Sequence, residues 1–569
     1  MTDNPNSKHI NHINQLLHNK GIKQEDRIGV LTSLFEKRKS LAVEALTVVI
    51  DPRFIDIIDA INAIDFTNKE ISQEIFMLFG SKLTRYKLDQ FYTPLTISEF
   101  ITGMMIPGKA AVDPAGGTGD LLVHYNGNIH IWDVDEHALE LCRFNYELNM
   151  KKNYQIKCGN SLIIDNDDAA AAAAAAFDYV TMNPPFGSST VITDDAILQH
   201  YELGVDRKKQ EIGILFLELG LKLLKPDGIL FAIVPAGYVG NSTKPCMDLR
   251  GLLLRHRVIA SIELPKQSFK RSGTGVNTYI LVIQKKAPAP APTPAPPYPI
   301  FISAIDNIGY ELSKANTPIK YKIVRETGEL QMQNGRPVVE NDLVECADQL
   351  AHFAYDEHIP NIVHRADDAD ADTLVYDTVV SSTLQNLILD VKRYSRKYRS
   401  LISELKSTPA CATINDLAKL IVKTTKIDSR KKYKYIDIGE ISTPLYGSKE
   451  LYGWELPSRA KYSLQKYDIL VSKLEGTVSY CVILDDSPNY ISTNGVSVIR
   501  PKNMNALYIL FANITKKDFI VQHNAYLTGS IMASLSDSDI GDILMNTQID
   551  VEMTKKMVEA LTALNALRL

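Results

Sequence analysis

A double proline directly after an apolar run constrains the fold of this chain more than any other feature. Residues 177–180 are apolar enough to form a buried parallel strand, and Asn183-Pro184-Pro185-Phe186 follows two residues later. Proline fixes φ and lacks an N–H group, so the chain can continue neither as a strand nor as a helix. The sequence therefore predicts a break at the carboxyl end of a strand, which is where open α/β sheets place their ligand sites.

The same four residues suit one chemistry, the methylation of an amine carried by a planar ring. The amide oxygen of Asn183 and the carbonyl of Pro184 could accept two hydrogen bonds from one NH2 group, while Phe186 stacks on the ring. Two aligned acceptors favour a tetrahedral nitrogen with a localised lone pair, placed for in-line attack on a methyl sulfonium. The catalytic candidates are Asn183, Pro184, Pro185 and Phe186. The alternative is an ordinary strand-to-loop turn with a chance proline pair.

A glycine-rich turn lies upstream. Residues 111–122 predict a short strand, the turn and the start of a helix, where glycines and unpaired N–H groups allow a ligand to approach. The next strand, 129–132, ends at Asp133, where an acid of a doubly wound sheet typically binds ribose hydroxyls. Together the two features favour an adenosine-containing cofactor over a structural turn. The turn reads DPAGGTG rather than GxGxxG, which disfavours NAD.

Composition sets looser bounds. A chain of 569 residues is too long for one core, so two to four domains are expected. Its six cysteines form no Cys-x-x-Cys pair, which argues against a disulfide framework or a zinc ribbon and fits a reducing cytoplasm. No apolar stretch is long enough to span a bilayer, and the first residues do not resemble a signal peptide, so we expect a cytoplasmic protein. The net charge of −5 argues weakly against nucleic acid, so basic clusters must be sought locally.

Three further regions carry no catalytic motif. Residues 8–90 have the apolar periodicity of helices. An uninterrupted alanine run, 169–176, is expected to be a surface connection. The proline-rich tract 287–297 predicts a stiff, extended loop, which we expect to close a long hairpin between strands at 279–283 and 300–302.

The motifs of residues 75–350 resemble the gamma-class N6-adenine DNA methyltransferases, especially the modification subunits of type I restriction–modification systems. The resemblance rests on Gln90 to Pro94, Asp113 to Gly119, Asp133, and Asn183 to Phe186. Segments 213–228, 229–235, 262–265, 273–278 and 305–310 agree with it. It implies S-adenosyl-L-methionine as the cofactor and no metal.

The resemblance also assigns roles to individual residues. The implied cofactor-binding residues are Gln90, Phe91, Tyr92, Thr93, Pro94, Asp113, Ala115, Gly116, Gly117, Thr118, Gly119, Asp120, Asp133 and Asn160. Asn160 stands where the family often has an aspartate, which leaves its donor–acceptor pattern open. Asn183 and Pro184 would orient the target N6, with Phe186 and Phe269 as the base pocket; a core aromatic is the alternative for Phe269. The adenine must be flipped out of the duplex to reach this pocket.

The last third of the chain suggests the polymer that is methylated. Residues 381–406 predict one long amphipathic helix, and short strands with turn residues then continue to Pro501. This segment and a closing helix at 551–567 resemble a target-recognition domain and spacer helix of type I specificity subunits. The DNA-binding candidates are Lys426, Arg430, Lys431, Lys432, Lys434 and Lys473. Double-stranded DNA is the expected partner, with a homodimer or separate restriction and specificity subunits as further options.

We therefore expect an α/β fold with a Rossmann-like methyltransferase domain, an N-terminal helical region and a C-terminal mixed α+β target-recognition domain. The expected boundaries are 1–80 for the helical region, 81–378 for the catalytic domain with its loop 287–299, 379–408 for a connecting helix, 409–546 for the recognition domain and 547–569 for the spacer helix. An RNA or protein-glutamine methyltransferase, a DNA-binding subunit of a larger restriction complex and an accessory protein with an inactive pocket are the alternatives.

Overall fold

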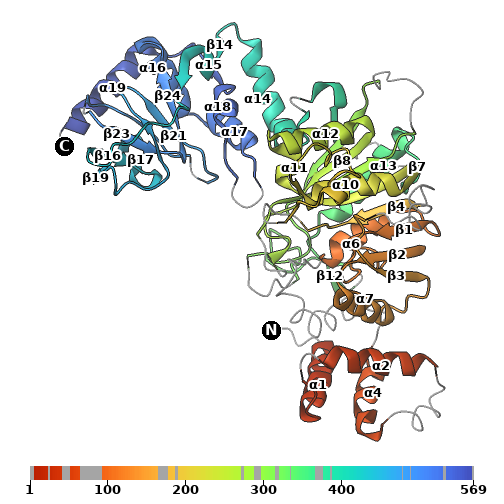
Figure 1. Ribbon diagram of the computed structural model, residues 1–569. Coiled ribbons are helices and arrows are strands. Elements are labelled where there is room, and N and C mark those ends of the chain that lie inside the picture. The colour runs from red at the N-terminus through yellow and green to blue at the C-terminus, as the bar shows by residue number, and fades with distance from the viewer. Residues whose placement is uncertain are drawn as a thin grey trace. The chain divides into compact units, whose positions relative to one another are not determined.

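The computed structural model divides into an N-terminal unit, residues 1–389, and a C-terminal unit, residues 390–569 (Figure 1). It describes residues 5–23, 26–40, 51–64, 93–163, 177–185, 190–270, 275–287, 296–313, 319–333, 335–364, 376–384, 387–476, 478–486, 488–529 and 533–566. Among these residues no helix is both long and apolar enough to cross a membrane.

A nine-stranded sheet forms the centre of the N-terminal unit, in the order β13-β10-β8-β9-β7-β4-β1-β2-β3. Its strands are β1 (Ala110–Asp113), β2 (Asn128–Asp133), β3 (Tyr154–Cys158), β4 (Phe177–Met182), β7 (Leu224–Pro235), β8 (Arg257–Glu263), β9 (Thr278–Gln284), β10 (Pro299–Ala304) and β13 (Asp377–Val380). Only β9 and β13 run antiparallel to their neighbours. The expected Rossmann-like α/β architecture is confirmed, and β4 is the buried parallel strand predicted before Asn183.

Helices cover both faces of this sheet (Figure 1). They include α6 (Leu95–Gly103), α7 (Glu136–Leu148), α10 (Ile212–Leu223), α12 (Lys244–Arg255) and α13 (Leu343–Asp356). Tyr179 and Phe231 belong to a core cluster with residues of α6, α7 and α13. Gly220 of α10 lies against Val180, Met182 and Leu230, and a Cβ there would come within 2.7 Å of Met182. Alternate residues of β4 and β7 therefore pack on opposite helical layers, as strand geometry requires.

The N-terminal helices α1 (Pro5–Asn19), α2 (Arg27–Ser40) and α4 (Ile55–Asn62) confirm the helical expectation where they are described. They pack on α7 through a cluster that includes Leu141, Phe144 and Leu148. The rings of Phe35 and Phe144 meet edge to face, with centroids 5.9 Å apart. This region therefore shares a core with the domain built on the nine-stranded sheet. Residues 41–50 and 65–92 lie outside the described residues.

The hairpin expected around the proline-rich tract is wrong. Strand β9 pairs with β7 on one edge and with β8 on the other, so neither edge of β9 is left for β10. Strand β10 instead pairs with β8 in parallel. The connection between β9 and β10 therefore passes across β8, and residues 288–295 within it lie outside the described residues.

The single connecting helix expected at 381–406 is also wrong. The segment contains two 3-10 turns, η4 (Ser381–Thr383) and η6 (Val391–Tyr394), and only then α14 (Arg396–Ser407). Leu389 bonds to other elements, because its N–H donates to Val239 O at 3.0 Å and its carbonyl accepts from Ser261 Oγ at 2.7 Å. Ser395 then caps α14 by accepting from the N–H of Tyr398 at 3.4 Å. These bonds replace the i to i−4 bonds that one continuous helix would need.

The C-terminal unit has the expected mixed α+β character. Two four-stranded sheets have the orders β15-β24-β21-β22 and β19-β16-β23-β20. Their strands are β15 (Ala418–Leu420), β16 (Lys432–Ile436), β19 (Lys449–Tyr452), β20 (Ala460–Ser463), β21 (Ile469–Ser472), β22 (Tyr480–Val482), β23 (Tyr490–Thr493) and β24 (Val496–Pro501). Its larger helices are α16 (Met504–Ile514), α17 (Lys517–Tyr526) and α19 (Val551–Ala566), of which α19 is the predicted closing helix.

Candidate active site

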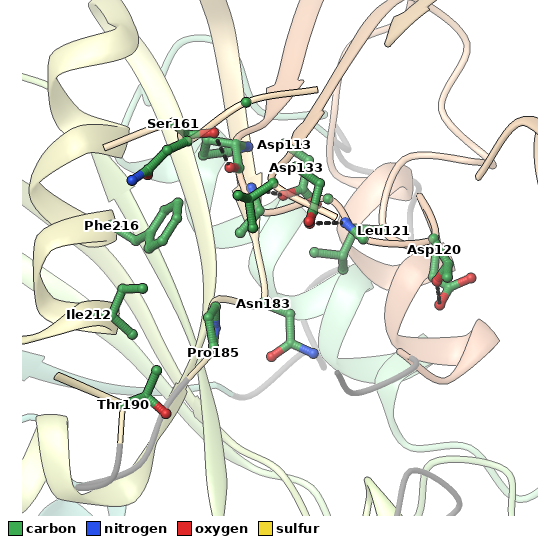
Figure 2. A pocket seen from close by; sticks show the side chains of 18 of the residues that line it. Asp113, Asp120, Leu121, Asp133, Ser161, Asn183, Pro185, Thr190, Ile212 and Phe216 are labelled. Carbon is green, nitrogen blue, oxygen red and sulfur yellow. Dashed lines mark hydrogen bonds between the residues drawn. The ribbon is translucent and has the colours of Figure 1, made fainter. Parts of the chain in front are cut away.

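The carboxyl ends of β1, β2 and β4 and the loop after β3 meet around one pocket of about 240 Å³ (Figure 2). Strand β4 ends at Met182, and Asn183 and Pro185 of the following turn line the pocket. The double proline therefore lies at the predicted ligand edge of the sheet. The remaining lining residues are Thr93, Asp113, Pro114, Ala115, Gly116, Gly117, Thr118, Asp120, Leu121, Asp133, Val134, Gly159, Asn160, Ser161, Thr190, Ile192, Ile212 and Phe216.

Three carboxylates gather on the cofactor-turn side of this pocket (Figure 2). Asp113 ends β1 and accepts from the N–H of Ala115 at 3.1 Å. Asp133 ends β2, and its two oxygens accept from the N–H groups of Gly117 at 2.8 Å and Asp135 at 2.9 Å. The glycine-rich turn between the two strands is therefore bonded to Asp133.

The pocket raises the pKa of all three acids. Burial is the main cause for Asp113, whose pKa is raised well above its ordinary value, with Asp133 and Asp120 adding like-charge repulsion. Burial also raises the pKa of Asp133, against the lowering effect of its backbone N–H partners. It raises the pKa of Asp120 from 3.8 to about 6. Because burial disfavours the ionised form of all three acids, the pocket favours a cationic ligand, whose charge would stabilise the carboxylates.

Asn183 presents an acceptor without a partner. Its Nδ2 donates to Thr93 Oγ1 at 3.4 Å. Its Oδ1 is buried, and no group among the described residues donates a hydrogen bond to it. Buried polar atoms are nearly always paired in folded proteins, so a buried orphan at the edge of a pocket points to a donor supplied by a ligand. The amide is therefore arranged to accept a hydrogen bond from an N–H or O–H group.

Thr93 connects Asn183 with the cofactor turn. The side chain is buried, and its hydroxyl receives the Asn183 amide. The backbone of Thr93 hydrogen-bonds to the Asp120 carboxylate. That carboxylate also accepts from Thr118 Oγ1 at 3.0 Å and Asn145 Nδ2 at 3.1 Å. Asp120 thus holds Thr93, and Thr93 holds the amide that faces the pocket.

Most of the predicted catalytic and cofactor-binding residues meet here. The predicted residues that line the pocket are Thr93, Asp113, Ala115, Gly116, Gly117, Thr118, Asp120, Asp133, Asn160, Asn183 and Pro185. Gly119 has φ +76° and lies against Tyr146 and Cys142, which gives it a packing role. Pro94 is the N-cap of α6, and Pro184 is buried in the turn. Gln90, Phe91, Tyr92 and Phe186 lie outside the described residues.

Phe269 does not stand at the pocket surface. It is 1% exposed and belongs to the large core cluster of the N-terminal unit. The core role, which was the alternative for this aromatic, is therefore the one that the structure supports. Phe269 is therefore not proposed to contact the target base.

Sequence reasoning missed part of the pocket wall. Ile212 and Phe216 enter it from α10, four residues apart and so on one face of that helix. Ser161 donates through Oγ to Pro114 O at 2.6 Å and joins the loop after β3 to the loop after β1. The apolar spacing on α10 was visible, but such spacing is the same for a core face and for a ligand face. Only the position of α10 beside β4 separates the two.

The DNA-binding candidates divide into two groups. Lys426, Arg430, Lys431 and Lys432 are exposed, and Lys434 is half-buried. Lys473 is 9% exposed, and its ammonium pairs with Asp537 at 2.7 Å. It also donates through its backbone N–H to Gly495 O at 2.9 Å. Because a buried, paired cation has little free charge to offer a phosphate, Lys473 is corrected to a structural residue.

Comparisons with known proteins agree with this site. The family model described as N-6 DNA Methylase matches residues 74–322, which include the glycine-rich turn, Asp133 and Asn183. A search of curated proteins finds no match.

Three solved structures are similar to the chain. One is a type I restriction–modification methyltransferase subunit from Streptococcus thermophilus, at 14% identity over 63% of this chain and 80% of that chain, with a TM-score of 0.37. The type IIG restriction endonuclease BpuSI has 13% identity over 98% and 73%, with a TM-score of 0.45. A DrdV–DNA complex has 11% identity over 99% and 69%, with a TM-score of 0.43. The family match covers residues 74–322, and the pocket at the ends of β1, β2 and β4 lies within the matched segment, which supports adenine-specific DNA methyltransferase activity.

Proposed function

We propose that the chain methylates the N6 of an adenine flipped out of duplex DNA, uses S-adenosyl-L-methionine as the methyl donor, and selects the adenine through its C-terminal unit. The observation that carries this proposal is the buried Asn183 Oδ1, which has no donor among the described residues. An exocyclic NH2 group is a donor of the kind that this oxygen lacks. Adenine N6 cannot reach it inside a duplex, so base flipping is required.

The pocket suits the proposed cofactor. Asp133 would bind the ribose hydroxyls, the turn from Ala115 to Thr118 would lie under the cofactor, and Asn160 would lie near its adenine. Three acids of raised pKa suit a ligand that carries positive charge. When bound, the cofactor supplies an activated methyl group on a cationic sulfonium. No metal is called for, and no group of three or more metal-ligating side chains occurs among the described residues.

The remaining roles fall on the Asn-Pro-Pro turn. Asn183 Oδ1 and the Pro184 carbonyl would accept from the two N6 protons, which holds the nitrogen lone pair away from the ring. Thr93 keeps the amide oriented, because an amide whose Nδ2 is already bonded to a hydroxyl leaves Oδ1 for the target. Phe186 would stack on the flipped base. The proton left on N6 after transfer can pass to solvent, so no general base is assigned.

The C-terminal unit would act as a target-recognition domain, with α19 as its spacer helix. Its own hydrophobic core supports a separate recognition role. Its exposed cations between residues 426 and 432 would bind phosphates without reading bases. We place the enzyme among the gamma-class methyltransferases and in a restriction–modification or related phage-defence system. Either a second copy of the chain or separate restriction and specificity subunits would be its protein partners.

The proposal is tested by mapping where methyl groups go. The full chain is incubated with labelled S-adenosyl-L-methionine and, in separate reactions, with plasmid DNA, structured RNA or a protein mixture. We expect label in DNA alone and N6-methyladenine in one sequence context when the product is read by single-molecule sequencing. Label in RNA or protein with none in DNA would contradict the proposal. Methylation of adenines in every context would contradict a recognition role for the C-terminal unit.

A further inference from the structure

The C-terminal unit exposes an aromatic pair beside its basic segment. Trp454 is 69% exposed and Tyr452 is 41% exposed. Their rings are stacked, with centroids 6.4 Å apart and planes 12° apart. Large aromatic side chains left in water are informative, because burying them would otherwise contribute much to folding. Such a pair is suited to contact with a partner.

The turn that carries Trp454 is built to hold it outward. Gly453 donates through its N–H to Lys431 O at 2.9 Å, and the N–H of Trp454 donates to Ser429 O at 3.2 Å. A Cβ on residue 453 would lie 2.1 Å from Asp428 O, so only glycine allows this close approach. The aromatic pair is therefore fastened to the basic segment and is not a loose loop tip.

Exposed cations surround the pair. Lys432 lies opposite Tyr452 in the β16–β19 register, and its ammonium is 5.3 Å from the centre of the Tyr452 ring. Arg430 and Lys431 precede it and are exposed. We call Arg430, Lys431, Lys432, Tyr452 and Trp454 the aromatic–basic patch.

These cations differ from others in the same unit. The cations found in ion pairs there include Arg393, Lys449, Arg459, Lys466, Lys473 and Arg500. None of the ion pairs found among the described residues involves Arg430, Lys431 or Lys432. Two acids close by in sequence, Asp428 and Glu455, accept backbone N–H groups, from Arg430 at 3.0 Å and from Tyr452 at 2.7 Å. The patch therefore holds three exposed cations that form no ion pair among the described residues, beside two acids whose carboxylates bond to the backbone.

We infer that the aromatic–basic patch is a duplex-DNA contact surface in which Trp454 and Tyr452 lie against deoxyribose and base atoms while Arg430, Lys431 and Lys432 bind the flanking phosphates. Adjacent exposed cations suit a polyanion, and an indole face suits the apolar part of a nucleotide. A protein partner would suit the aromatic pair, but it would need an acid for each of the three cations, whereas a DNA backbone carries a phosphate at every nucleotide. This inference rests on the proposed function for its choice of DNA, and it adds the aromatic contact that the basic cluster alone does not predict.

The chain offers a direct probe, because its two tryptophans are Trp132 and Trp454. In a Trp132→Phe background Trp454 is the only tryptophan, so its quenching by acrylamide reports its exposure. We expect addition of duplex fragments of plasmid DNA to reduce the quenching constant by about half or more, since contact excludes the quencher. Unchanged quenching in the presence of saturating duplex DNA would overturn the inference.

Affinity measurements separate the two halves of the patch. Trp454→Ala should weaken duplex binding on the order of tenfold while leaving the slope of log affinity against log salt unchanged. Trp454→Phe should recover part of the loss. Ile520→Ala, which shortens an exposed apolar side chain on α17, is the matched control. Because Trp454 is exposed, its variants are expected to have the same melting temperature as the parent protein.

Three results for Trp454→Ala would overturn the inference. They are a duplex affinity equal to that of the parent, a loss of self-association without a loss of duplex binding, and a loss of single-strand binding without a loss of duplex binding. The assay needs no methyl transfer, so failure of the patch and failure of the proposed chemistry are distinguishable. Duplex protection of Trp454 without adenine methylation would overturn only the proposed function.

Discussion

The active-site pocket and the aromatic–basic patch use polar groups in opposite ways. In the pocket, acids are withdrawn from water until their pKa values rise, and Asn183 Oδ1 is buried with no hydrogen-bond partner in the part of the chain that the structure describes. In the patch, cations stand in solvent beside exposed rings. A buried unsatisfied group costs stability and is completed only by a ligand, whereas an exposed charge costs little and acts over a distance that salt shortens. Changes in the pocket should therefore be large and specific, and changes to the cations of the patch should be small and dependent on salt.

Lysines of the C-terminal unit repeat this contrast at smaller scale. Lys473 is buried and paired with Asp537, while Lys431 and Lys432 are exposed. The same residue type thus has a structural role in one place and a surface role in another. Burial, which sequence does not state, separates the two.

The largest effect is expected from Asn183→Ala. Loss of the amide oxygen removes the acceptor proposed for N6, and removal of one such preorganised group typically costs about 10²- to 10³-fold in kcat. Cofactor affinity should stay near that of the parent, because the acids and the glycine turn are untouched. Single-turnover transfer and equilibrium dialysis measure the two quantities. Asn153→Ala, the same change at an exposed position before β3, is the control, and retained transfer in Asn183→Ala would refute the role of the amide.

A smaller effect is expected from Thr93→Val, which keeps the shape of the side chain but removes the hydroxyl that receives Asn183 Nδ2. The amide can then rotate, so kcat should fall by roughly 10- to 100-fold with little change in KM. Thr93→Ser should restore most of the activity. A matching loss of cofactor affinity in the valine variant, or no recovery with serine, would show that Thr93 acts on the cofactor or on folding instead.

The pH dependence of stability tests the electrostatics of the pocket. The pKa of Asp120 is raised from 3.8 to about 6 in the folded protein, so the folded state holds a proton that the unfolded state has released. Its stabilising contribution is complete below about 3.8 and is lost as pH rises through about 6. The stability of Asp120→Asn relative to the parent should therefore rise as pH rises from about 3.8 to about 6 and stay level at higher pH, measured by urea unfolding without cofactor. A stability difference that does not change with pH would contradict the raised pKa.

The smallest effects are expected for single cations of the patch. Lys431→Ala and Lys432→Ala should each reduce the salt slope of DNA binding by about one, which corresponds to one phosphate contact. Lys466→Ala is the matched control, because Lys466 already pairs with Asp486 at 2.9 Å. Filter binding over a series of salt concentrations measures the slope. Equal slopes in all three variants would place the phosphate contacts elsewhere.

Residue types and their short-range spacing were enough to predict the elements around the candidate active site. Strand β4, the break at Pro184, the glycine turn and Asp133 were all predicted, because proline, glycine and strand-ending acids impose their geometry within a few residues. The prediction for 381–406 failed for the opposite reason. Within this range the α-helix covers only α14. The segment before it is not α-helical, because Leu389 hydrogen-bonds to Val239 and Ser261, which are more than a hundred residues away in the chain.

The residues of this chain alone therefore predicted which groups could bind a cofactor and an exocyclic amine, since those groups follow from residue type and short-range spacing. Tertiary structure alone decided which of them are available. It placed Phe269 in the core, paired Lys473 with Asp537, set Thr93 against Asn183, and left Trp454 in solvent beside Lys432. Burial and pairing depend on contacts between segments far apart in the chain, and no local pattern encodes them.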